Sequence, residues 1–272
     1  MQIIPAGGQA RELWLRMVIW GGWKSGKTTL AASFPAPILI HPLVESGYDT
    51  VRRGQQYLCA VLPLGETHAM WMQGKGGVPV SEELFAAVQS IYLGVKDGSM
   101  PYKTIVLGGF SMFQKLVIEE MDRRADSMRK GKEKDLYRKW GLVLEWATRM
   151  AHVLFTIPAH VIIELNQKER TEGGLAVYEP DLAGQTQNIF LNDANVVVFQ
   201  QATPIGYFTH FRATPGAMAA PRFSELWGGV PVQNCCYDYF ADHLGLPPIW
   251  VADPFHPRCQ PRAWPWDCHW HV

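Results

Sequence analysis

The amino-acid sequence predicts an α/β fold in which helices cover both faces of a mostly parallel central sheet. Short apolar runs alternate with amphipathic segments along most of the chain, as in consecutive βαβ units. Most of the runs are continuously apolar, which is expected of parallel strands buried on both faces. A glycine-rich segment, GGWKSGKT, joins the first run to a helical segment. Together these three observations favour a three-layer α/β sandwich.

Six apolar runs are expected to form the parallel strands, and one further segment to pair antiparallel at the sheet edge. The edge segment is GYFTHF, residues 206–211. The six runs, in chain order, span residues 13–20, 37–41, 57–62, 103–107, 160–165 and 195–199.

Three helices between these strands carry apolar residues at helical spacing. The first is expected to begin at Ser81, a favourable N-cap residue, with Glu82 and Glu83 in its first turn. Ser111 is expected to cap the second, and the third is expected over about 135–155. Their apolar stripes are expected to pack against the sheet.

The segment after the first strand carries the clearest chemical motif. Gly21-x-x-x-x-Gly26-Lys27-Thr28 is a complete G-x-x-x-x-G-K-[ST] pattern, which lets the backbone wrap around phosphate groups. Lys27 is expected to reach the β- and γ-phosphates, and Thr28 to ligate Mg²⁺. The alternative is a glycine-rich β-turn. The predicted nucleotide-binding residues are Gly21, Gly22, Trp23, Lys24, Ser25, Gly26, Lys27, Thr28 and Thr29.

The composition limits the other function classes. The 25 basic residues equal the 25 acidic ones, so any contact with nucleic acid must be local. Apolar runs of about eight residues are too short to cross a bilayer, and the N-terminus lacks a signal-peptide pattern. We therefore expect a cytoplasmic protein, without a membrane partner, whose five cysteines are reduced.

The segment GGWKSGKTTLAASFPAPILIH resembles the opening of the RecA-like AAA-type ATPases of bacteriophages and prophages, which are linked to single-strand annealing and recombination. Glu45 and Gly47 in HPLVESGYDTV look like that family's acidic residue and glycine. HVIIELNQKER resembles its sensor strand, PDLAGQTQNIF the following loop and helix, and PRFSELWGG its late basic-aromatic motif. The resemblance covers about 13–229 and implies a RecA-like P-loop fold with ATP and Mg²⁺ as cofactors.

The resemblance also implies roles for individual residues besides Lys27. Glu45 would orient the attacking water, unless it is a solvated loop glutamate. Either Asn166 or Gln167, with Gln167 preferred, would sense the γ-phosphate. Arg222 would reach the nucleotide of a neighbouring subunit, unless it is a surface arginine.

Residues 168–185 occupy the place of a DNA-binding loop in the RecA-like enzymes. Lys168 and Arg170 would contact phosphates of single-stranded DNA, and Tyr178 would stack on a base. An ordinary β-hairpin is the alternative. The mixed-charge run at 122–139 is expected to be a solvated helix end or loop, with DNA contact as its alternative.

The strand at residues 103–107 departs from the pattern of P-loop ATPases. Such enzymes place an aspartate at the end of this strand, where it holds Mg²⁺. Here Gly108 and Gly109 follow the strand. Either Ser111 or Glu45 serves instead, or hydrolysis is slow or absent.

The chain is expected to divide into a nucleotide-binding domain over 1–245 and an irregular tail over 246–272, which is dense in proline, tryptophan, histidine and cysteine. Four tail ligands could hold zinc, but their spacing matches no standard zinc pattern, so a packed, reduced tail is preferred. The candidate ligands are His256, Cys259, Cys268, His269 and His271.

Taken together, the sequence predicts an ATP-binding protein, a DNA-dependent ATPase of phage-type recombination or single-strand annealing. It would act as a homo-oligomer with nucleotide at the subunit interface, in the host cytoplasm if phage-encoded. One alternative is a hydrolysis-deficient protein that uses nucleotide as a structural or assembly ligand, which Gly108 favours. Another is a helicase or packaging motor, against which the lack of an evident second enzymatic domain counts.

Overall fold

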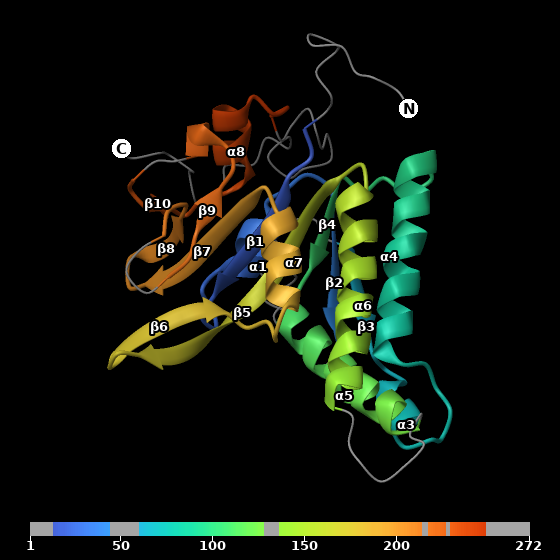
Figure 1. Ribbon diagram of the computed structural model, residues 1–272. Helices are drawn as coiled ribbons and strands as arrows, with labels where there is room; N and C mark the ends of the chain where they lie inside the picture. Colours follow the sequence, from blue (N-terminus) through green and yellow to red (C-terminus); the bar gives the residue numbers. More distant parts are fainter. Residues whose placement is uncertain (1–12, 44–59, 128–135, 214–216, 227–228, 249–272) are drawn as a thin grey trace, which may run out of the picture.

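The computed structural model describes residues 13–43, 60–127, 136–213, 217–226 and 229–248. One large sheet forms the middle layer, and helices lie on both of its faces (Figure 1). This is the predicted three-layer α/β architecture of a P-loop NTPase. In the described part of the chain, no helix combines the length and the apolar character that crossing a bilayer requires.

The sheet has the strand order β10-β8-β7-β1-β5-β4-β2-β3. The pairs among β7, β1, β5, β4, β2 and β3 are parallel, whereas β8 and β10 add antiparallel strands beyond β7. The strands are β1 (Arg16–Gly21), β2 (Pro37–Pro42), β3 (Ala60–Leu64), β4 (Thr104–Leu107), β5 (His160–Glu172), β6 (Leu175–Pro180), β7 (Val196–Thr203), β8 (Gly206–His210), β9 (Ala220–Pro221) and β10 (Val232–Gln233).

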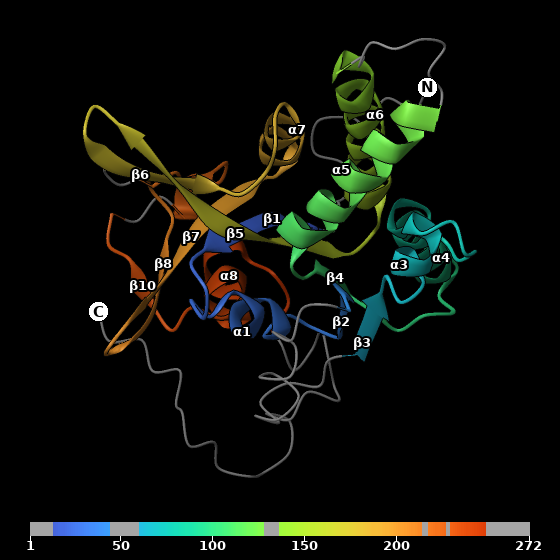
Figure 2. The same ribbon diagram turned by 90° about the horizontal axis from the view of Figure 1, so that it is seen from below.

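The helices divide between the two faces of the sheet, as the view from below shows (Figure 2). The long helices α4, α5 and α6, together with α7, cover one face, and α1 and α8 cover the other. The helices are α1 (Lys27–Ala32), α3 (His68–Met72), α4 (Val80–Asp97), α5 (Phe110–Ser127), α6 (Leu136–Thr156), α7 (Thr186–Asp193), the 3-10 helix η1 (Ser224–Leu226) and α8 (Tyr237–Leu244).

Alternate residues of the central strands enter two separate cores, because successive side chains of a strand point to opposite faces. Residues facing α4–α7 include Val18, Trp20, Ile105, Leu107 and Ile163. Residues facing α1 and α8 include Met17, Ile19, Val106, Ile162 and Val198. Both sets are buried. The central strands are therefore apolar on both sides, which explains their continuous apolar runs.

The two predicted helix caps are wrong, because each serine makes a tertiary contact instead. Helix α4 begins one residue earlier, after Pro79, and the Ser81 hydroxyl donates to the buried Glu120 carboxylate at 2.5 Å. Helix α5 begins at Phe110, and Ser111 Oγ accepts the main-chain N–H of Asn166 at 3.0 Å. Both serines therefore join elements that are distant in sequence.

Two further differences concern the strands. Strand β8 is antiparallel as expected, but β10 lies outside it and forms the edge. Strand β5 continues beyond Leu165 to Glu172 and pairs with β6, so residues 168–180 form the β-hairpin considered as an alternative. This hairpin projects from the sheet beside β7 and β8 (Figure 1).

Candidate functional site

The loop that joins β1 to α1 takes the shape of a phosphate-binding loop. Gly26 has φ +86° and ψ 12°, a left-handed conformation that glycine adopts without strain. A β-carbon there would lie 2.7 Å from Cγ of Tyr207, and one at Gly21 would lie 2.1 Å from the carbonyl oxygen of Gln200. Both glycines of the motif are therefore required by the packing of the loop against β7 and β8.

The Lys27 ammonium group is held inside the loop. Its Nζ donates to the carbonyl oxygens of Gly21 at 3.1 Å and Gly22 at 2.8 Å. The side chain therefore folds back along the loop, where its charge can act on any anion that the loop encloses. Trp23, at the outer turn, is 85% exposed. Ser25 Oγ is buried, with no hydrogen-bond partner among the described residues.

A buried carboxylate meets the second hydroxyl residue of the motif. Thr28 Oγ1 donates to Oε2 of Glu164 at 2.9 Å. Glu164 lies on β5 opposite Ile19 of β1, and it is only 4% exposed. The sequence interpretation missed this residue, although a carboxylate within the otherwise apolar HVIIEL run was a signal, because burying a charge is costly without compensation.

A protein-family model described as an AAA domain matches residues 14–222, which include the loop, Glu164 and the hairpin. The protein belongs to the AAA domain family. A search among curated proteins finds no match to it.

The side-chain amide of Gln167 lies beside the loop of this AAA domain. A β-carbon at Gly22 would lie 3.5 Å from Gln167 Oε1, so the two residues are neighbours. The main chain of Asn166 is held elsewhere: its N–H donates to Ser111 Oγ, and its carbonyl accepts from Asp181 at 2.7 Å. Ser111 is thus engaged with β5, and its role toward a metal stays a prediction.

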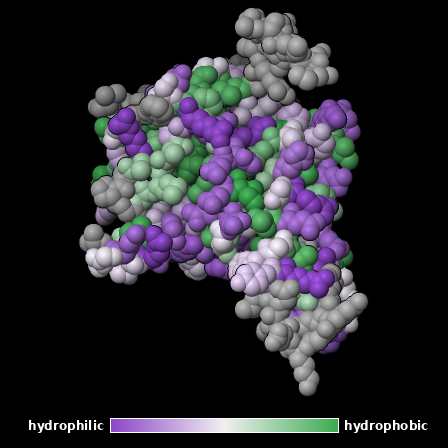
Figure 3. Space-filling view, viewed as in Figure 1, coloured by the Kyte–Doolittle hydropathy of each residue, from purple (hydrophilic) through white to green (hydrophobic). Residues whose placement is uncertain are grey.

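The hairpin places the predicted DNA-binding cations beside carboxylates. Lys168 Nζ lies 3.3 Å from Glu179 Oε1, and an Arg170 nitrogen lies 2.7 Å from Glu172 Oε2. Tyr178 is half-buried and packs against the core beneath α4–α7. Hydrophilic residues prevail on the surface where the hairpin lies (Figure 3). A base could therefore stack only on the part of the Tyr178 ring that this contact leaves exposed.

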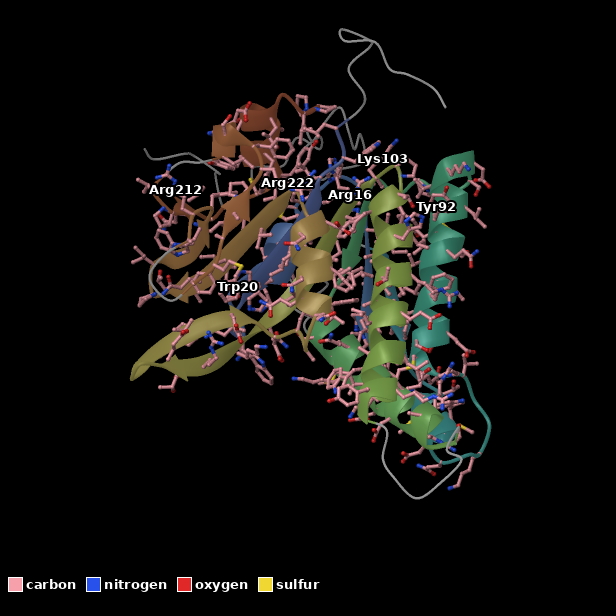
Figure 4. All side chains as sticks on the ribbon, viewed as in Figure 1. Arg16, Trp20, Tyr92, Lys103, Arg212 and Arg222 are labelled. Atoms are coloured by element: carbon pink, nitrogen blue, oxygen red, sulfur yellow. The ribbon has the colours of Figure 1, made fainter. Side chains whose placement is uncertain are left out.

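Arg222 lies near the amino ends of β7 and β1, whereas the phosphate loop follows the carboxyl end of β1. Its main-chain N–H donates to the Asn195 carbonyl at 2.8 Å, and its guanidinium donates to the Asn192 carbonyl. Figure 4 shows Arg222 and Arg16 toward the same end of the strands, and Arg16 is the first residue of β1. Within one chain Arg222 is thus remote from the loop, and a role at a nucleotide would need a second subunit.

Several predicted site residues lie outside the described part of the chain, namely Glu45, Gly47 and the histidines and cysteines of the tail beyond residue 248. Cys235 and Cys236 are described, and both are buried thiols. Across the ranges that the structure describes, no group of three histidine, cysteine, aspartate or glutamate residues could hold a metal ion.

The loop residues fit the nucleotide and Mg²⁺ that the family generally binds. Lys27 supplies a positive charge within the loop, and Ser25 supplies a buried hydroxyl whose hydrogen-bonding capacity is unused in the described structure. Mg²⁺ in nucleotide sites usually keeps waters and binds one or two protein oxygens plus phosphate. Thr28 offers one such oxygen beside the loop, and the carboxylate of Glu164 accepts its hydrogen bond.

Proposed function

We propose that this AAA domain protein binds ATP with Mg²⁺ through the loop Gly21–Thr28 and hydrolyses the ATP, and that hydrolysis is coupled to single-stranded DNA. The observation that supports nucleotide binding best is the position of Lys27, whose ammonium group lies 2.8 Å from the Gly22 carbonyl. A triphosphate could replace these carbonyl contacts with ion pairs between the ammonium group and the phosphate oxygens, in which both partners are charged.

In this proposal the residues around the loop divide the work. Mg²⁺, when bound, would neutralise charge on the β- and γ-phosphate oxygens. Lys27 binds the same oxygens, and the glycines keep side chains out of their way. Gln167, beside Gly22, is placed to contact the γ-phosphate. Glu45 is proposed to orient the attacking water, a role that its resemblance alone supports.

A phosphate-release assay with a matched pair of lysine variants tests hydrolysis. Lys27→Ala should abolish phosphate release and weaken nucleotide binding. Lys24→Ala, which removes an exposed cation from the same loop, should change both by much less. Equal phosphate release by wild type and Lys27→Ala would remove the enzymatic proposal. If wild type binds nucleotide but releases no phosphate, the result would instead support a role of the nucleotide as a structural or assembly ligand. Gly108, which stands in place of the aspartate, favours this alternative.

The coupling to DNA rests on the family resemblance and on the projecting hairpin. The Arg170–Glu172 pair is more than half exposed on both sides. Exposed pairs contribute only about 0–1 kcal/mol, so DNA phosphates could compete for the cation. Single-stranded DNA should accelerate phosphate release, and the acceleration should fall as salt rises.

The matched variants for this test are Lys168→Ala with Arg170→Ala on the hairpin, and Lys96→Ala on α4. The hairpin variant should lose the DNA response, and the α4 variant should keep it. If DNA neither shifts in a gel at low salt with ATP and Mg²⁺ nor alters hydrolysis, the role in recombination or annealing is wrong.

Assembly with nucleotide between subunits is a separate part of the proposal. Arg222 would act across that interface, since it lies far from the loop of its own chain. Sedimentation with and without ATP should show nucleotide-dependent association, and Arg222→Ala should reduce hydrolysis while leaving nucleotide affinity nearly unchanged. Full hydrolysis by a monomer would exclude this role for Arg222.

A further inference from the structure

Position 108 lacks the carboxylate that P-loop ATPases use to hold Mg²⁺. Gly108 directly follows β4, and β4 is separated from the loop-bearing β1 by β5 alone. A β-carbon at Gly108 would meet Leu39 Cδ1 at 2.8 Å and would lie 3.7 Å from Glu164 Oε2. The carboxylate oxygen of Glu164 therefore lies next to the place where a side chain at position 108 would begin.

The register of the sheet explains this proximity. Leu107 of β4 pairs with Ile163 of β5, so Gly108 lies level with Glu164. Alternation of side chains places both residues on the face of Val106 and Ile162, which is the face covered by α1. The carboxylate of Glu164 thus lies one strand nearer to β1 than a carboxylate at position 108 would, and on the side of the sheet where Thr28 lies.

The hydrogen bond between Thr28 and Glu164 has the direction that metal binding needs. A hydroxyl group has one proton to donate and two lone pairs. Because Thr28 Oγ1 donates its proton to Glu164 Oε2, its lone pairs remain for a cation. Glu164 is only 4% exposed, so its carboxylate is held in this position beside Thr28.

We propose that Glu164 replaces the missing aspartate: it orients Thr28 and supplies the negative charge for Mg²⁺ from β5 instead of β4. Glu164 is thus a positioning residue for the metal, and Thr28 is its ligand. This inference rests on the proposed nucleotide function.

The test measures metal affinity instead of turnover. Mn²⁺, a paramagnetic substitute for Mg²⁺, is titrated into the complex of the protein with a non-hydrolysable ATP analogue, and its binding is followed by electron paramagnetic resonance. Glu164→Gln keeps the size of the side chain and removes its charge. It should weaken metal binding about 10–100-fold, as loss of an outer-shell partner does. Glu119→Gln, at an exposed position on α5, is the matched control and should bind the metal normally.

A double variant tests whether a carboxylate on β4 can replace the carboxylate on β5. Gly108→Asp combined with Glu164→Gln restores a carboxylate at the usual position, and only the end of the flexible Leu39 side chain stands in its way. This double variant should recover most of the lost metal affinity. In the wild-type background, Gly108→Asp should not raise the metal affinity, because two adjacent carboxylates repel each other.

The outcomes separate the two proposals. If wild type does not bind the nucleotide analogue at all, the proposed function fails. If wild type binds metal and nucleotide but Glu164→Gln binds the metal equally well, only the role of Glu164 is overturned. Should Glu164→Gln fail to fold, Thr28→Val gives the decisive result, since it removes the ligand and leaves the carboxylate. Unchanged metal affinity in Thr28→Val would likewise overturn the inference.

Discussion

His160 should make the stability of this protein depend on pH, because the fold buries it in its neutral form. The side chain is 3% exposed, and its Nδ1 accepts the main-chain N–H of Leu15 at 3.0 Å. Burial, followed by the positive charge of Arg16, lowers the pKa of His160 to about 3. Protonation of Nδ1 would also remove the lone pair that Leu15 uses.

The size of the effect follows from the two pKa values. The unfolded chain binds a proton near pH 6.5, whereas the folded chain does so only near pH 3. The stabilisation is therefore complete above about pH 6.5, and it is lost progressively as the pH falls toward 3. Between pH 7 and pH 4.5, His160 alone should lower the free energy of unfolding by about 2.5 kcal/mol.

Urea denaturation at pH 7 and pH 4.5 measures this loss. His160→Asn keeps a hydrogen-bond acceptor but does not titrate, and it should be less stable than wild type at pH 7 because it packs less well. Its additional loss at pH 4.5 should be smaller than that of wild type by about 2.5 kcal/mol. Equal losses in the two proteins would mean that His160 carries a proton in the folded state, and the reasoning would be wrong.

Two further substitutions test the loop and the α4–α5 contact. Gly26→Ala should abolish nucleotide binding and cost about 1–3 kcal/mol of stability, measured by thermal denaturation, because φ is +86° and the new methyl group would meet Tyr207. Glu120→Ala should cost about 1–3 kcal/mol in urea denaturation, since it leaves the buried main-chain N–H and hydroxyl group of Ser81 without their acceptor. Glu119→Ala, exposed on the same helix, should change stability by less than about 0.5 kcal/mol.

The sequence predicts elements well where the signal is local. The continuous apolar runs predict the central strands because burial on both faces leaves no polar positions in them. The phosphate loop is recognisable because its glycines, lysine and threonine act within one short segment. By contrast, Ser81 and Ser111 were misassigned as caps, since their partners Glu120 and Asn166 lie on other elements. Local pattern carries no information about such partners.

The candidate site shows the same limit more sharply. The absence of an aspartate at Gly108 is visible in the sequence, but the position of Glu164 depends on strand order. Only the insertion of β5 between β1 and β4 brings this residue beside Thr28. Glu45, which the sequence offered as a substitute, lies outside the described residues. A motif that is missing from one strand is therefore best sought on the strand next to it.

Strand β5 unites the features on which the proposed coupling depends. Glu164 contacts Thr28, and Gln167, on the same strand, lies beside Gly22. Beyond Gln167 the strand continues without interruption into the hairpin with β6. The contact to Thr28, the contact to the loop and the projecting hairpin thus lie on one continuous element, and in the proposed coupling a shift of β5 at the nucleotide would reach the hairpin along its backbone.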